Sequence, residues 1–204
     1  MKFYDVSLPI KESMITYPGN PSPTIKQYSS IPKDKVNEFL ICLGSHSGTH
    51  VDSKNHIDRD GEGVEELSLE SFFGRCKVID LTNVEKEIHI EDLRDCGIEK
   101  EDIVLLKTKN SLVSYKNFRK DYVHVKIDAA KYLVEVGVKT LGFDYLSVKK
   151  FGEDDEVHEV LISNLTLFEG LDLSKVPEGT YTFLGLPLRV SCDGSPSRVL
   201  LIED

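Results

Sequence analysis

Cysteine and tryptophan are scarce in this sequence: tryptophan is absent, and the four cysteines among 204 residues are scattered without a C-x-x-C pair. This excludes a disulfide-stapled scaffold and a cysteine-based zinc ribbon, and it favours free thiols in a reducing compartment. Long apolar runs are also missing, because residues 1–5 carry no signal core and no run approaches the roughly 20 residues of a membrane span. We therefore expect a cytoplasmic protein with no membrane partner.

Basic residues are in the minority, with 25 Lys and Arg against 35 Asp and Glu, a net charge of −10 and a pI of about 5.1. A nucleic acid partner requires a basic surface, so this charge argues against one. A serine nucleophile is not expected either, since the sequence has no G-x-S-x-G elbow. The composition, 40% hydrophobic and 29% charged, is ordinary for a globular protein, and the length suits one domain over residues 1–204.

Histidine is concentrated in residues 44–58, which read Gly-Ser-His-Ser-Gly-Thr-His-Val-Asp-Ser-Lys-Asn-His-Ile-Asp. Three of the six histidines lie here, His46, His50 and His56, with Asp52 between the last two. Neutral imidazole and carboxylate are ligands that zinc and manganese take in proteins. A lone histidine is usually a solvated surface residue, but this group indicates a metal or catalytic site.

The spacing of the group predicts how the chain must bend. On a straight strand His46 and His50 would stand roughly 13 Å apart, too far to share one ion. A turn at residues 47–48 would bring them together, because glycine permits a sharp bend. A helix would also do so, but residues 47–51 are poor helix formers. We therefore expect a strand, a glycine turn and a short extended run on which His50 and Asp52 point the same way.

The run from His46 to His56 resembles the His-x-Gly-Thr-His-x-Asp-x-Pro-x-His signature of the metal-dependent cyclase-like hydrolases, a family that includes bacterial kynurenine formamidases and isatin hydrolases. Residues 164–173 and 186–200 are also similar to the family pattern, so the resemblance covers the chain nearly end to end. One position departs from the signature, because Lys54 stands in place of the proline.

The resemblance implies a divalent metal site with two ions per subunit, zinc being the first expectation and manganese the alternative. The implied metal ligands are His46, His50, Asp52, His158 and Glu169. Among these, His46 and His50 would hold one ion and His158 the other. Asp52 and Glu169 would bridge the pair.

His56 is then implied to be the general acid/base of the reaction. Its ordinary pKa near 6.5 suits taking a proton from water and passing it to a leaving amine. The spacing leaves open that His56 is itself a ligand. Glu159 likewise remains an alternative to His158 as the metal ligand from residues 157–173.

The resemblance implies hydrolysis of a C–N amide bond in a small molecule, of the arylformamidase or cyclic-amide type, with metal-activated water as the nucleophile. Tyr17 stands where the family has a pocket-lining tryptophan, and we expect Tyr17 and Lys54 to contact the substrate. Alternatives are a lactone hydrolase or cyclase on the same site, or a metal-binding protein without turnover. The expected partners are a small-molecule amide and further copies of the chain, in a homo-oligomer that is a dimer or higher.

The remaining pattern predicts a mixed α/β, strand-rich single domain, and the family fold implied is a swivelling β/β/α domain. A helix is predicted over residues 126–136, ended by Gly137. Residues 111–123 are predicted to form a loop at the pocket rim, residues 193–196 a turn, and Cys42 a buried strand residue. Predicted strands cover residues 3–10, 24–30, 38–43, 76–81, 102–107, 139–145, 180–190 and 198–202.

Overall fold

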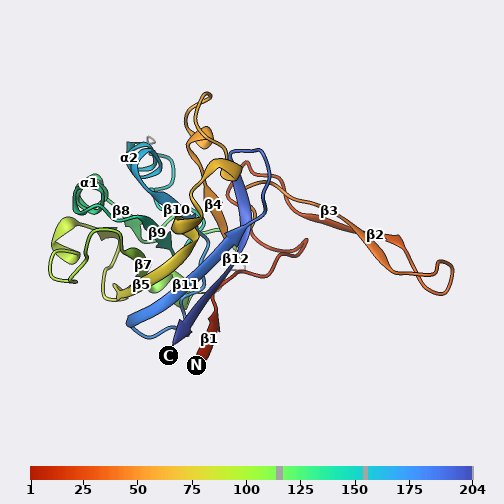
Figure 1. The fold of residues 1–204 in the computed structure, drawn as a ribbon, viewed down its shortest axis with the longest axis horizontal. Coiled ribbons are helices and arrows are strands. Elements are labelled where there is room, and N and C mark those ends of the chain that lie inside the picture. Colours follow the sequence, from red (N-terminus) through yellow and green to blue (C-terminus); the bar gives the residue numbers. More distant parts are fainter. Residues whose placement is uncertain (114–116, 154–155, 204) are drawn as a thin grey trace.

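The computed structural model describes residues 1–113, 117–153 and 156–203, and within them it shows a closed β-barrel, helices on the outside, and a long hairpin projecting from one side (Figure 1). The barrel closes in the order β4-β12-β11-β5-β7-β9-β10, because both β10 and β12 pair with β4, and β1 pairs with the outer edge of β12. The strands of this sheet are β1 Lys2–Asp5, β4 His50–Asp52, β5 Phe73–Asp80, β7 Ile103–Lys107, β9 Thr140–Phe143, β10 Thr166–Glu169, β11 Gly179–Pro187 and β12 Gly194–Glu203.

One side of the barrel is parallel, since β5, β7, β9 and β10 all run in the same direction. Parallel neighbours need long crossovers, and the two α-helices lie in them: α1 (Ile127–Val136) precedes β9 and α2 (Glu156–Asn164) precedes β10. The predicted helix over residues 126–136 is thus confirmed, and Gly137 ends it with a left-handed φ of 84°. The short elements are β6 Glu87–Ile88, β8 His124–Val125 and the 3-10 turns η1 Lys54–His56, η2 Val64–Glu66, η3 Leu69–Phe72, η4 Ile90–Asp92 and η5 Lys109–Leu112.

The side chains of strand β7 belong to two hydrophobic cores, one inside the barrel and one between the barrel and the helices. All five of its residues are buried, as its continuous apolar run predicted. Because side chains alternate along a strand, Ile103 and Leu105 point into the barrel, whereas Val104 and Leu106 pack under α1 and α2. The mixed α/β, strand-rich, single-domain architecture expected from the sequence is therefore confirmed.

A two-stranded hairpin, made of β2 (Thr24–Ser29) and β3 (Glu38–Cys42), leaves the body of the molecule. Figure 1 shows it reaching away from the barrel, and the two strands pair only with each other in the described chain. Every residue of β3 is exposed, Cys42 included, so the prediction that Cys42 is buried is wrong. We call residues 24–42 the arm.

The turn predicted at residues 193–196 is also wrong beyond its first residue. Residues 194–196 belong to β12 and pair with β4 in the register Gly194 to Asp52 and Pro196 to His50. This pairing closes the barrel and brings the end of the chain onto the histidine-rich segment. No α-helix in the described ranges is long and apolar enough to cross a membrane.

Candidate metal centre

The histidine-rich segment folds as its spacing predicted. His46 lies in a turn after β3, the chain bends at Gly48 with a left-handed φ of 69°, and His50 and Asp52 stand at the two ends of β4. A side chain at Gly48 would also press on Ile10 and Met14, each 3.2 Å from the position of its Cβ atom. Glycine therefore suits this position for two reasons: it adopts the left-handed backbone angle, and it has no side chain.

Other elements bring the remaining candidates to the same place. Register pairs Glu169 at the end of β10 with His50 on β4, α2 supplies His158, and η1 supplies His56. A cavity of about 190 Å³ lies among these side chains. Its walls include seven of the predicted site residues: Tyr17, His46, His50, Asp52, His56, His158 and Glu169.

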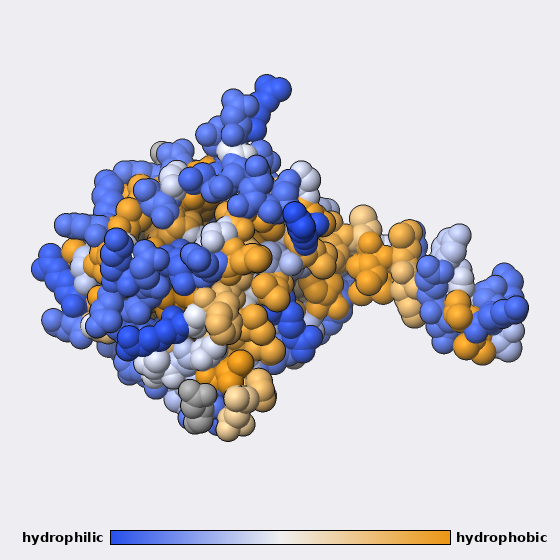
Figure 2. All heavy atoms as spheres, viewed as in Figure 1, coloured by the Kyte–Doolittle hydropathy of each residue, from blue (hydrophilic) through white to orange (hydrophobic). Residues whose placement is uncertain are grey.

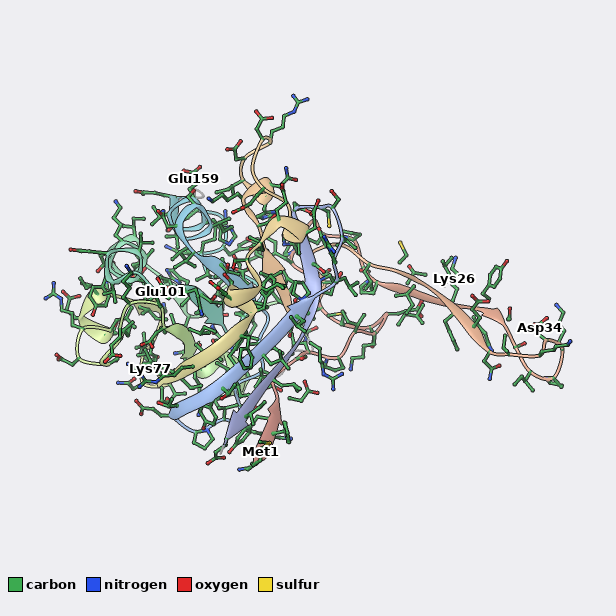
Figure 3. All side chains as sticks on the ribbon, viewed as in Figure 1. Met1, Lys26, Asp34, Lys77, Glu101 and Glu159 are labelled. Atoms are coloured by element: carbon green, nitrogen blue, oxygen red, sulfur yellow. The ribbon has the colours of Figure 1, made fainter. Side chains whose placement is uncertain are left out.

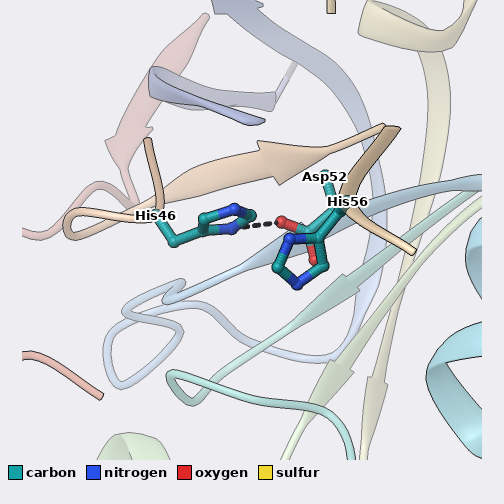
Figure 4. A group of neighbouring side chains, drawn as sticks. All are labelled: His46, Asp52 and His56. Carbon is teal, nitrogen blue, oxygen red and sulfur yellow. Dashed lines mark ion pairs between the residues drawn. The ribbon is translucent and has the colours of Figure 1, made fainter. Parts of the chain in front are cut away.

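Two groups of ligand atoms share Asp52. In one group His46, Asp52 and His56 offer atoms that lie within 4.8 Å of one another, and in the other His50, Asp52 and Glu169 do so. Figure 4 shows the first group, with the Nδ1 atom of His46 2.8 Å from the Oδ1 atom of Asp52. An aspartate common to two ligand groups is the arrangement that a pair of bridged cations requires.

His50 is oriented by the backbone. Its Nδ1–H group donates to the carbonyl oxygen of Gly48 over 3.0 Å, so its Nε2 atom is left to face Asp52 at 3.3 Å and Glu169 at 3.8 Å. Fixing one ring nitrogen in this way selects the tautomer whose other nitrogen can bind a metal.

His46 is oriented by a carboxylate that the sequence did not single out. Its Nε2–H group donates to the Oδ2 atom of Asp193 over 2.8 Å, while Nδ1 faces Asp52. Burial opposes a charge on this imidazole, but Asp52 and Asp193 outweigh it and raise the pKa of His46 to about 9. An additional positive charge between His46 and Asp52 is therefore favoured, whether a proton or a metal ion supplies it.

Asp52 provides the test of whether this donor set fits a metal. The residue is 2% exposed, and neither carboxylate oxygen accepts a hydrogen bond of good geometry. Burial tends to raise its pKa, yet the neighbouring His50 and His46 hold the pKa well below its usual range, so the carboxylate is ionised. A buried, ionised carboxylate surrounded by imidazole nitrogens fits a divalent cation, because such a charge is costly to bury without a partner.

Glu169 and His158 form the other side of the site. The Oε1 atom of Glu169 accepts from the backbone N–H of Val148 over 2.6 Å and lies 3.1 Å from the Nε2 atom of His158. Burial lowers the pKa of His158 and Glu169 raises it, with a net upward shift. His158 thus lies next to one of the expected bridging carboxylates, while Glu159, its rival in the sequence, does not line the cavity.

Asp193 is a functional candidate that sequence reasoning missed. Its Oδ2 atom also lies 3.2 Å from the Nδ1 atom of His56, so one carboxylate oxygen holds two histidines. Burial works against its ionisation, but His46 and His56 lower the pKa of Asp193 to about 2. The neighbouring Gly194 leaves space for this contact, since a Cβ atom there would lie 2.8 Å from the Cε1 atom of His46.

Tyr17 forms an aromatic wall of the cavity. Its ring meets Phe118 edge to face at 5.4 Å and lies 5.8 Å from Phe151. Phe118 belongs to the loop predicted at the pocket rim, residues 111–123, of which 114–116 lie outside the described residues. The aromatic packing means that Tyr17 supports the wall as well as facing the cavity.

Lys54 lies elsewhere than the sequence suggested. It does not line the cavity of Tyr17 and the histidines, and its Nζ atom lies 3.7 Å from Glu62 beside a neighbouring surface hollow. The 3-10 turn η1 places Lys54 and His56 on different sides of the chain, which local spacing alone did not reveal. The lysine on the cavity wall is Lys149.

Comparison with known proteins gives a consistent family. A family model described as "Putative cyclase" matches residues 4–150. The chain is 30% identical to the kynurenine formamidase of Bacillus anthracis over 98% of this chain and 97% of that protein. It is 34% identical to a solved structure described as a potential metal-dependent hydrolase with cyclase activity, with a TM-score of 0.87 over 100% of this chain and 99% of the other. Isatin hydrolase A from Labrenzia aggregata, 20% identical with a TM-score of 0.87 over 100% of this chain and 94% of the other, shows the same fold.

Proposed function

The chain belongs to the cyclase family of metal-dependent hydrolases, and on that premise we propose that it cleaves the formamide of N-formylkynurenine or a similar aryl amide that carries a carboxylate. It is a metal-dependent hydrolase of non-peptide C–N bonds. The observation that carries the proposal is the pair of ligand groups that share Asp52 at the wall of a small cavity. A cavity of about 190 Å³ suits a small molecule, not a protein chain.

The metal site would be held by His46, His50, Asp52, His158 and Glu169. A divalent ion bound there would lower the pKa of a water ligand and polarise the substrate carbonyl. We propose zinc first and manganese second, with two ions per subunit, because nitrogen and carboxylate oxygen ligands suit both metals.

His56 is proposed to move the proton. Its Nδ1–H group donates to Asp193, so the Nε2 atom carries the lone pair that accepts a proton and later returns it to the leaving amine. Asp193 fixes the ring and its tautomer, as a carboxylate beside a catalytic histidine does in other hydrolases. The alternative role of His56, as a ligand beside His46 and Asp52, rests on the same closeness of atoms and is separated from the first by metal content.

Two cavity walls would select the substrate. Tyr17, packed on Phe118, offers a flat aromatic surface for the aryl ring of the substrate. Lys149 lies on the cavity wall where Lys54 was expected, and we propose that it contacts the substrate and recognises its carboxylate. A cytoplasmic location and a homo-oligomeric state complete the proposal; the location is supported by four cysteines that are all free thiols.

The experiment is a substrate panel with the purified protein after loading with zinc or with manganese. N-formylkynurenine, its neutral carboxamide and an aryl lactone are compared by release of the formyl group or by ring opening. We expect N-formylkynurenine to have the highest kcat/KM, the carboxamide a raised KM, and chelation to abolish turnover. Turnover of the lactone alone would contradict the proposal in favour of an esterase-type activity.

A further inference from the structure

A second group of histidines lies outside the cavity, on the small ribbon formed by β6 and β8. The parallel register pairs Glu87 with His124, so these two side chains lie on the same face of the ribbon. His89 follows Glu87 by two residues in extended conformation, and its side chain therefore points to that face too. Glu87 thus stands between two imidazoles that the candidate metal centre does not use.

Both imidazoles face the carboxylate of Glu87 through their Nε2 atoms. The Nε2 atom of His124 lies 3.5 Å from Oε1, and that of His89 lies 3.6 Å from Oε2. The Nδ1–H group of His124 donates to the carbonyl oxygen of Tyr122 over 3.4 Å. The Nδ1–H group of His89 donates to the carboxylate of Asp128 over 3.2 Å. These hydrogen bonds hold both rings in the tautomer whose Nε2 lone pair is available to a metal ion.

His124 shows that this group lacks a partner. The residue is 5% exposed, and its Nε2 atom has no hydrogen-bond partner within the described parts of the chain. Burial lowers the pKa of His124, which favours the neutral imidazole. The lone pair of Nε2 and the oxygen atom of Glu87 are then both acceptors, and a buried acceptor without a partner is costly. A cation between the two atoms would satisfy both.

The distances suit a transition metal ion of the zinc type. Zinc binds imidazole nitrogen and carboxylate oxygen at about 2.0–2.2 Å, so a tetrahedral angle places two such donors roughly 3.3 Å apart. The 3.5 Å between His124 and Glu87 is close to this value. The side chains of Glu87 and His89 are 39% and 44% exposed, so they can turn toward an ion held at the buried His124. Two nitrogen donors favour zinc, cobalt or nickel over magnesium and calcium, which prefer oxygen.

Lys126 is the cation that now lies nearest to the carboxylate. Its Nζ atom is 3.7 Å from the Oε1 atom of Glu87, too far for a hydrogen bond, and its side chain is 31% exposed. The flexible stem of a lysine allows the ammonium group to move into solvent when a metal ion enters. Figure 2 shows that the surface around α1, into which β8 leads, is mainly hydrophilic, so ions in solution can approach this side.

We propose that Glu87, His89 and His124 bind one divalent transition metal ion, in a site that we call the ribbon site. The inference goes beyond the proposed function, because none of the three residues lines the cavity. Strand β8 begins directly after residues 111–123, the loop that carries Phe118 of the aromatic wall. An ion in the ribbon site would join the end of this loop to β6.

The test counts zinc bound to the full chain at about 10 μM free zinc, which fills a site of micromolar affinity. Wild-type protein should hold one more ion per chain than Glu87→Gln or His124→Gln, because the candidate metal centre is intact in all three. Glu101→Gln is the matched control, since Glu101 is an exposed acid at another place on the surface (Figure 3). Near-ultraviolet circular dichroism checks that each variant keeps its fold, and Glu87→Gln changes only a partly exposed side chain.

Two further variants make the test specific for the ribbon site. Lys126→Met should bind the additional ion about 10-fold more tightly, because it removes a positive charge beside Glu87. Glu91→Gln should keep the ion, although Glu91 offers a ligand atom near His89 and Asp128. Equal zinc counts in wild-type protein and both Glu87→Gln and His124→Gln would overturn the proposal. So would loss of the additional ion in Glu91→Gln alone, since the ion would then lie beside Asp128.

Discussion

Asp193 holds two histidines with one oxygen atom, and this makes it the most informative single side chain of the site. It lies 2.8 Å from His46 and 3.2 Å from His56, yet in the sequence it stands in an ordinary Asp-Gly-Ser-Pro context. A carboxylate behind a metal-binding histidine sets its tautomer and its basicity. Through His56 the same carboxylate acts on the group proposed to move the proton.

We predict that Asp193→Asn lowers metal affinity or kcat by about 10- to 100-fold, the usual cost of losing such a partner. Metal affinity is measured by competition with a chromogenic chelator, and kcat on the metal-saturated enzyme. Asp60→Asn is the control, because Asp60 is an exposed acid in a surface turn. Unchanged affinity and rate in Asp193→Asn would reduce Asp193 to the structural turn residue that the sequence suggested.

His56→Gln separates a proton carrier from a ligand. If His56 carries the proton, the variant keeps its metal and loses kcat by about 10²- to 10⁴-fold. His50→Gln is the comparison, because His50 faces both Asp52 and Glu169 and should lose metal. Elemental analysis of both purified variants decides: equal metal loss would make His56 a ligand.

Gly170, directly after strand β10, closely approaches the backbone of the glycine bend before β4. A Cβ atom at Gly170 would overlap the carbonyl oxygen of Gly48, so the close approach of the two segments needs glycine. Thr49 adds a hydrogen bond from its hydroxyl group to the carbonyl oxygen of Gly170. Because Glu169 precedes this contact and His50 follows it, the contact sets the distance between two of the proposed metal ligands.

We predict that Gly170→Ala destabilises the protein and reduces bound metal, whereas Gly97→Ala produces only the first effect, and more weakly. Both glycines have a left-handed φ, 71° and 62°, so both variants bear a strain of about 1–2 kcal/mol. Only Gly170→Ala adds a backbone clash, since the nearest atom to a Cβ at Gly97 is 4.0 Å away. Urea unfolding and elemental analysis test this; equal behaviour of the two variants would contradict it.

The sequence predicted the elements whose conformation depends on residues close together in the chain. The alternation of His50 and Asp52 with the glycine bend gave the shape of the metal segment, and the 3.6-residue period gave α1 with its glycine end. Asp193 was missed because its role depends on the pairing of β12 with β4, which joins distant parts of the chain. Cys42 was misplaced because, among the described residues, its strand pairs only with β2, and an apolar pattern does not tell whether the rest of the chain covers a strand.

The stability of the whole molecule should depend on the charge of Asp144, an acid at the centre of the fold. Asp144 is fully buried and accepts hydrogen bonds from the backbone N–H groups of Thr108 and Ser111 and from the hydroxyl group of Thr108. Burial raises the pKa of Asp144 to about 6, and these hydrogen bonds offset only part of the shift. The folded chain therefore keeps this proton at a higher pH than the unfolded chain does.

We predict that this group lowers the free energy of unfolding as pH rises from about 4 to about 6, by at most about 1.4 kcal/mol per pH unit. The sign follows because the folded state binds more protons than the unfolded state in that window. Urea unfolding of wild-type protein and Asp144→Asn at several pH values measures it. The variant should lose this slope, so its stability relative to wild type should rise with pH; parallel curves would contradict the assignment.

Closure of the barrel by its last strand also sets the order of events during synthesis. His46 leaves the ribosome 147 residues before Asp193, and the short strand β4 waits for β10 and β12 before it has a neighbour on either edge. Contacts this distant in sequence form late in folding. The nascent chain therefore carries the proposed ligands of residues 46–52 in an open, unpaired segment, and we predict that it retains metal only after translation is nearly complete. Metal uptake by a growing chain would thus report that the last strand has docked.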